Sequence, residues 1–117
     1  MTLLTPDIER NIYEHARTLI EYGWCQNDYA QDEAGKPLYV HSPPAPRYWS
    51  LGGALYQSVH LAGAGRFYAV LESNLVQLLP ESGLGLEEYN DLPTTTKEHV
   101  ITLLNRAIAA RTAKNED

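Results

Sequence analysis

A single cysteine, followed along the chain by histidines and asparagines, could form a nucleophilic catalytic site. Cys25, His60 and Asn90 occur in the order nucleophile, base and orienting residue, with Asp91 as an alternative to Asn90. A reactive thiolate needs a positive charge or a helix N-terminus beside it, whereas Cys25 follows the end of a predicted helix. We therefore expect an inert thiol and no catalytic residue. A small thiol-dependent enzyme that uses Cys25 with His60 stays the alternative function.

The histidines and glycines lack the spacing of metal and nucleotide sites. None of the four histidines has a second histidine three or four residues away, and the chain has no second cysteine. We therefore expect no metal and no cofactor. Glycines at 52–53 and 63–65 could present N–H groups to an anion, but neither run has the Gly-Lys-Ser/Thr ending of a nucleotide loop. Close packing at 52–53 and a tight turn at 63–65 are the structural interpretation.

Aromatic residues outside the predicted helices are the most informative candidates for binding. The chain has eight tyrosines and two tryptophans but one phenylalanine. Such side chains combine apolar area with a polar group, which suits contact surfaces, although filling the core of a hairpin layer is the alternative. Residues 89–93, Tyr-Asn-Asp-Leu-Pro, add side chains that hold turns or grip a ligand. The expected binding residues are Trp24, Tyr48, Tyr89, Asn90 and Asp91.

An amphipathic helix over residues 5–22 opens the predicted fold. Apolar residues recur on one face at helical spacing, Thr5 has the side chain of an N-cap, and Gly23 suits the C-terminus. The helical period disappears over residues 24–40, where short aromatic and β-branched runs flank a turn at 32–36. This pattern predicts a β-hairpin.

Further amphipathic helices follow along the chain. Apolar residues recur at helical spacing over 51–62 and 66–79, and the last helix begins at a capping box formed by Thr95 and Glu98. A stiff proline-rich loop precedes the first of these helices, and a loop over 81–93 precedes the last. Because each helix has one apolar face, the helices must pack on one another. The expected fold class is α+β and mainly helical, with about four helices and one hairpin between the first two.

Length, composition and charge bound the class of protein. The 117 residues fit one compact domain, expected over 1–111, with a frayed polar tail at 112–117. A hydrophobic content of 44% excludes a disordered chain, and no apolar run is long enough to span a bilayer. The net charge is −6 and the cations are scattered, so we expect no direct contact with nucleic acid. The N-terminus lacks the pattern of a secretory signal, which predicts a cytoplasmic protein.

Three short motifs lie across the chain: Gly-Trp-Cys-Gln at 23–26, Gly-Ala-Leu at 53–55 and Tyr-Asn-Asp at 89–91. Together they resemble an uncharacterised domain-of-unknown-function family of small bacterial and phage proteins. The third motif of that family is Trp-Asn-Asp, so Tyr89 replaces its tryptophan. The proline-rich segment before Trp49 resembles an insertion relative to that family. The resemblance supplies no substrate and no activity.

These observations favour a non-catalytic, small acidic binding protein with a protein partner. The contact surface would be built from the hairpin, the proline-rich loop and the loop over 81–93. By analogy alone, such a protein could be a phage or mobile-element inhibitor of a host factor. A third possibility is a small-molecule binder with a pocket between Trp24, Tyr89 and Asn90.

Overall fold

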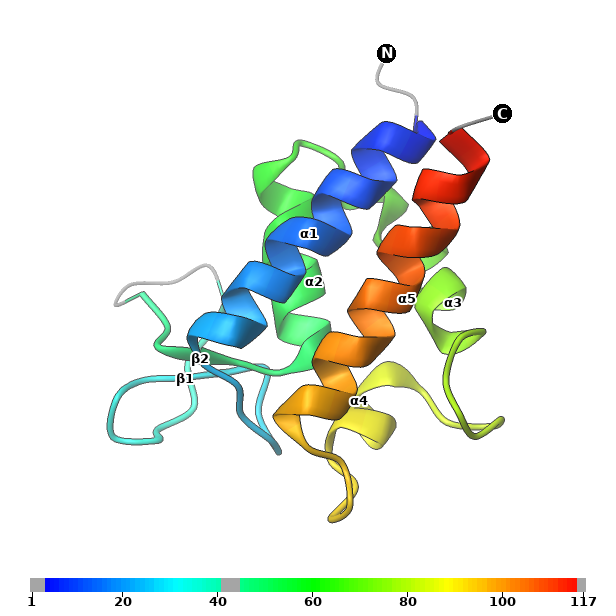
Figure 1. The fold of residues 1–117 in the computed structure, drawn as a ribbon. Coiled ribbons are helices and arrows are strands. Elements are labelled where there is room, and N and C mark those ends of the chain that lie inside the picture. The colour runs from blue at the N-terminus through cyan, green and yellow to red at the C-terminus, as the bar shows by residue number, and fades with distance from the viewer. Residues whose placement is uncertain (1–3, 41–44, 116–117) are drawn as a thin grey trace.

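The structure is a computed structural model that describes residues 4–40 and 45–115 (Figure 1). It has the predicted α+β, mainly helical architecture. The helices are α1 (Pro6–Tyr22), α2 (Leu51–Leu61), the 3-10 helix η1 (Gly65–Phe67), α3 (Tyr68–Val76), α4 (Leu86–Asn90) and α5 (Lys97–Asn115). The strands are β1 (Ala30–Gln31) and β2 (Tyr48–Trp49), which lie between α1 and α2 in the chain. No helix within the described residues is long and apolar enough to cross a membrane.

Helix α1 begins and ends where the sequence predicts. The Thr5 hydroxyl accepts a hydrogen bond from the N–H of Ile8 at 3.1 Å, and the N–H of Gly23 donates to the carbonyl of Leu19. Apolar side chains of α1 are buried on one face, as its period requires. This face packs against α2 and α5, and α5 lies antiparallel beside α1 (Figure 1).

The core fills the space between α1, α2 and α5. Its largest fully buried aliphatic side chains come from all three of these helices and from α3 and α4, so each amphipathic face is covered by a neighbour. They include Ile12, Ile20, Leu55, Leu71 and Leu104. Burial of one such side chain stabilises the fold by about 2 kcal/mol, which explains why these helices are stable only together.

The predicted turn at 32–36 is present, but the strand that pairs with β1 comes from further along the chain. The N–H of Asp32 donates to the carbonyl of Lys36 at 3.0 Å, which closes the turn. The segment that follows makes only an isolated bridge to β1, through Pro37. Gln31 and Pro37 form the non-hydrogen-bonded pair of this bridge, which tolerates a residue without an N–H. The N–H of Leu38 still donates to the carbonyl of Ala30 at 2.9 Å, but residues 38–40 form no strand.

Strand β2 supplies the antiparallel partner of β1. Ala30 lies opposite Trp49, and Gln31 lies opposite Tyr48. The buried Trp49 also bridges to Trp24 on its other side, so β2 is sandwiched between β1 and the chain that leaves α1. The pairing therefore falls at the end of the predicted proline-rich loop. Residues 41–44 of that loop lie outside the described residues.

The helices differ from the prediction in three further respects. The helix predicted over 66–79 is divided into η1 and α3 and ends at Val76, and the loop predicted over 81–93 contains α4. Helix α5 extends to Asn115, into the segment predicted as a tail.

The capping box predicted from Thr95 and Glu98 is wrong. Thr96 is the cap, because its hydroxyl accepts from the N–H of His99 at 3.2 Å and its own N–H donates to His99 Nδ1 at 3.1 Å. The Thr95 hydroxyl instead donates to the carbonyl of Tyr89 at 2.7 Å. This buried bond joins Thr95 to α4 and moves the start of α5 one residue along the chain.

Candidate functional site

Asn90 is fully buried at the end of α4 and joins three separate segments. Its Oδ1 accepts a hydrogen bond from Trp24 Nε1 at 2.8 Å and another from the backbone N–H of Leu51 at 3.0 Å. Its Nδ2 donates to the carbonyl of Cys25 at 3.1 Å. Two of the expected binding residues, Trp24 and Asn90, therefore bind each other.

The side chains next to Asn90 extend this network. Asp91 Oδ1 accepts from the N–H of Asn27 at 2.8 Å and from Asn90 Nδ2 at 3.0 Å. Gln26 Nε2 donates to the carbonyls of Asn90 and Leu92, each at 2.9 Å. We call Trp24, Gln26, Asn27, Asn90 and Asp91 the Asn90 cluster. It joins the first and third sequence motifs, and it fixes the chain that leaves α1 against α4.

Glu87 of α4 accepts hydrogen bonds from donor groups at the N-terminus of α2. Its Oε1 accepts from the Ser50 hydroxyl and from the N–H of Gly52, both at 2.8 Å, while the Ser50 oxygen accepts from the N–H of Gly53 at 3.1 Å. Burial raises the pKa of Glu87, and the bonds from Ser50 and Gly52 oppose that rise. These bonds occupy helix N–H groups that would otherwise lack partners.

The glycines at 52–53 are explained by close packing, as predicted. A side-chain carbon on Gly53 would overlap the carbonyl oxygen of Tyr29. One on Gly52 would meet the Glu87 carboxylate. Gly53 of the second motif thus lets Tyr29, which precedes β1, approach the start of α2, and Gly52 does the same for α4.

Cys25 and His60 do not form a catalytic pair. Cys25 is 6% exposed, and burial, with Asp28 and two further carboxylates nearby, raises the pKa of its thiol to about 12. Its carbonyl accepts a hydrogen bond from Asn90, whose side chain also binds the N–H of Leu51 at the start of α2, whereas His60 lies in the last turn of that helix. Nine residues of helix correspond to about 13 Å, well beyond hydrogen-bond reach.

Tyr48 belongs to a surface stack of rings around an arginine. The Arg47 guanidinium carbon lies 4.4 Å from the centre of the Tyr22 ring and 5.0 Å from that of Tyr48. Arg47 Nη1 also donates to the carbonyl of Tyr22 at 2.8 Å. Tyr22 is 63% exposed, and Tyr48 is half-buried. We call Tyr22, Arg47 and Tyr48 the tyrosine–arginine stack.

Sequence reasoning selected Tyr48 but missed Tyr22 and Arg47. Tyr22 is the last residue of the predicted first helix and lies outside its apolar stripe. This position could have indicated an exposed aromatic side chain. Arg47 precedes Tyr48 directly, but its contact with Tyr22 depends on the path of β2. That path requires Gly23, because a side-chain carbon at this position would overlap the carbonyl oxygen of Arg47.

Tyr89 faces a different part of the molecule from the Asn90 cluster. Its side chain is 7% exposed and lines a cavity of about 170 Å³ beside α5. Burial and the nearby Glu81 raise the pKa of the Tyr89 phenol. The structure does not bring Tyr89 into a common pocket with Trp24 and Asn90, whose polar groups bind each other directly.

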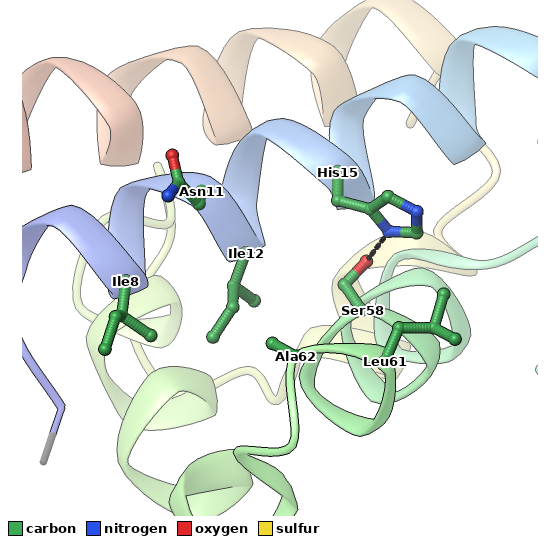
Figure 2. Close-up of a pocket in the computed structure, with 7 residues that line it drawn as sticks. All are labelled: Ile8, Asn11, Ile12, His15, Ser58, Leu61 and Ala62. Carbon is green, nitrogen blue, oxygen red and sulfur yellow. Dashed lines mark hydrogen bonds between the residues drawn. The ribbon is translucent and has the colours of Figure 1, made fainter. Parts of the chain in front are cut away.

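A larger cavity, of about 320 Å³, lies between α1 and α2 (Figure 2). Its lining residues are Ile8, Asn11, Ile12, His15, Ser58, Leu61 and Ala62. His15 Nδ1 and the Ser58 oxygen are 2.8 Å apart, and the Ser58 hydroxyl donates to the carbonyl of Ala54 at 2.8 Å. Since this hydroxyl has one proton, the hydrogen-bond network assigns the donor role to His15 Nδ1. Ser58 is thus not activated as a nucleophile.

A second buried polar cluster joins α1, α3 and α5. Glu9 Oε2 accepts from the Tyr13 hydroxyl at 2.6 Å, from Asn74 Nδ2 at 3.0 Å and from Arg111 Nε at 2.8 Å. These contacts pair a buried carboxylate with a cation and further donors, as burial of a charge requires. Within the described part of the chain, no three potential metal ligands form a group.

The sequence model of DUF6197, a family of unknown function, matches residues 5–110. The chain belongs to this family. The match covers the Asn90 cluster and the tyrosine–arginine stack of this DUF6197 domain. Membership of an uncharacterised family is thus confirmed, and the bacterial or phage origin stays a prediction. No curated protein and no solved structure matches this DUF6197 domain.

Proposed function

We propose that this DUF6197 domain is a non-catalytic binding protein that contacts a partner protein through the tyrosine–arginine stack. The observation that carries the proposal is the position of the Arg47 guanidinium, 4.4 Å and 5.0 Å from the centres of two tyrosine rings at the surface. Tyrosine and arginine are enriched among the residues that dominate the binding energy of protein interfaces.

The stack is held in one geometry by the backbone around it. The N–H of Arg47 donates to the carbonyl of Gln31 at 2.9 Å, and its guanidinium donates to the carbonyl of Tyr22. A side chain that is already ordered loses less conformational entropy on binding. This restraint supports a contact surface that is preformed rather than assembled by the partner.

Three of the other expected binding residues act in this proposal as positioning residues. The Asn90 cluster holds the chain at Trp24, next to Gly23, and Gly23 is where the stack packs on the end of α1. Trp24, Asn90 and Asp91 therefore support the contact from beneath. The finer expectation, a phage or mobile-element inhibitor of a host factor, stays a prediction.

The experiment that tests the proposal is affinity capture from a lysate of the source organism. The tagged wild-type domain is compared with Tyr48→Ala and with Tyr56→Ala, a control in which the lost ring contacts Tyr68 instead. We expect one protein to be captured by the wild type and by Tyr56→Ala, and to be lost with Tyr48→Ala. If every protein captured by the wild type is also captured by Tyr48→Ala, the proposal is wrong.

Small-molecule binding is a second candidate, favoured by the cavity between α1 and α2. Its volume of about 320 Å³ lies near the lower end of the range of ligand sites, and its lining combines aliphatic side chains with Asn11, His15 and Ser58. A ligand that binds the folded state raises the melting temperature. We expect such a rise across a metabolite panel for the wild type and its loss in Ala62→Leu, which fills the cavity. A panel without any response would exclude this candidate.

A further inference from the structure

A small cavity beside α5 gathers hydrogen-bond donors on the surface of an acidic protein. Its volume is about 170 Å³, and it is lined by Pro80, Tyr89, His99, Thr102, Leu103 and Arg106. Four of these side chains carry N–H or O–H groups, and none of the described residues that line the cavity carries a carboxylate. The chain has a net charge of −6, so a cavity that is lined by donors and by no carboxylate of the described residues contrasts with the acidic composition.

The helical period of α5 brings most of these side chains together. His99, Thr102 and Arg106 lie three and four residues apart, which places them along one face of the helix. Leu103 lies between them and is buried, so it forms an apolar floor. Tyr89 of α4 also lines the cavity.

The hydrogen bonds around the cavity determine which atoms are free to donate. The N–H of Thr96 donates to His99 Nδ1, so the hydrogen-bond network assigns the ring proton of neutral His99 to Nε2. Arg106 Nη1 donates to the carbonyl of Leu78 at 3.0 Å, which orients a guanidinium that has further N–H groups. The Tyr89 phenol is protonated at neutral pH, as an ordinary tyrosine is, and is therefore a donor.

We propose that this cavity binds the phosphoryl group of a small phosphate monoester. Its volume is about that of five or six water molecules, which suits one such group. Donors from α4 and α5 line the cavity, and the three oxygens of a phosphoryl group can accept from more of them than the two oxygens of a carboxylate. Arginine is the side chain best suited to an oriented contact with phosphate oxygens. The apolar Leu103 and Pro80 would contact the organic part of the ester.

Glu81 is the carboxylate that opposes this binding. Glu81 directly follows Pro80, which lines the cavity, and its charge raises the pKa of Tyr89, so it is placed to repel an anion there. Replacement of Glu81 by the neutral, isosteric Gln is therefore expected to strengthen binding. The proposed phosphoryl site does not depend on the tyrosine–arginine stack, and its failure would leave the proposed protein contact intact.

The test is an NMR titration of the backbone amides at constant ionic strength, with phenyl phosphate, inorganic phosphate and acetate as probes. We expect saturable shifts at residues of α5 that line the cavity, with phenyl phosphate the tightest and acetate the weakest of the three. Arg106→Gln is expected to weaken phenyl phosphate binding about tenfold, because it removes a charged hydrogen-bond donor. Arg66→Gln, which removes the same charge on η1, is expected to leave the affinity unchanged.

Arg106 also binds the carbonyl of Leu78, so Thr102→Val provides a second variant that keeps shape and charge. We expect it to weaken binding by about threefold to tenfold, with an unchanged melting temperature. Shifts that do not saturate, or equal losses in Arg106→Gln and Arg66→Gln, would overturn the proposal. Acetate that binds as tightly as phosphate, or inorganic phosphate as tightly as the ester, would also overturn it.

Discussion

Trp24 Nε1 donates a hydrogen bond of 2.8 Å to Asn90 Oδ1, and this bond joins two segments that are 66 residues apart in the sequence. The same oxygen accepts from the N–H of Leu51 at the start of α2. One side chain therefore satisfies donors from the end of α1 and from the start of α2. These two bonds hold together the segments on either side of the β1–β2 sheet.

Asn90→Ala is expected to lower the free energy of unfolding by about 3 kcal/mol, because it leaves two donors without their acceptor. Urea denaturation measures the change. Asn11→Ala is the matched control, since Asn11 is exposed and its loss should cost less than about 0.5 kcal/mol. A similar, small effect of both variants would contradict the structural role of Asn90.

Gly53→Ala is expected to destabilise the domain by about 2 kcal/mol or more, because the added carbon overlaps the carbonyl oxygen of Tyr29. Gly65→Ala is the control, since a carbon at Gly65 meets nothing within 4 Å. Thermal unfolding of the two variants compares them directly. Equal melting temperatures would show that α2 does not pack on the Tyr29 backbone as described.

The stability of the domain is expected to fall as the pH rises above about 8.5. Burial and nearby carboxylates raise the pKa of Cys25 to about 12, whereas an unfolded thiol ionises near 8.5. Between these values the unfolded chain releases a proton that the folded chain keeps, so unfolding becomes easier. By pH 10 this thiol accounts for a loss of up to about 2 kcal/mol.

Cys25→Ala isolates this effect from that of other groups. Tyr13 and Tyr68 also have a raised pKa through burial, so the wild type and the variant share their contribution. Urea denaturation at pH 8 and pH 10 should show a smaller fall for the variant. A thiol that titrates below 8.5 in the folded protein would instead favour the thiol-dependent enzyme.

Arg111→Met is expected to cost about 3 kcal/mol, because it leaves the buried Glu9 carboxylate without its cation. The double variant Glu9→Met with Arg111→Met removes both charges and should recover part of that loss. Urea denaturation of the single and double variants gives the coupling between them. Strictly additive losses would mean that the 2.8 Å contact contributes nothing.

Helices α1, α2 and α5 were largely predictable because their signals are local, whereas α4 lies in a segment predicted as a loop. Thr5 caps α1 as expected, and the apolar stripe of that helix is its buried face. The start of α5 was misplaced because Thr94, Thr95 and Thr96 carry the same local signal. A long-range bond from Thr95 to the carbonyl of Tyr89 decides between them.

The pairing of the strands could not be predicted from periodicity. Each strand has two residues, which is too short for an alternating pattern, and Tyr48 follows a proline-rich segment. Asn90 was recognisable as a candidate from the sequence because asparagine side chains hold turns or bind ligands. Its partners Trp24 and Leu51 are distant in sequence, so only the fold identifies them.

The most direct test of the proposed function is the affinity of the captured partner for three purified forms of the domain. Titration calorimetry compares the wild type with Tyr48→Ala and Tyr56→Ala, after thermal unfolding has shown that all three are folded. A contact through the tyrosine–arginine stack predicts a dissociation constant about tenfold or more higher for Tyr48→Ala, and a change below about twofold for Tyr56→Ala. The same dissociation constant for all three forms would contradict it.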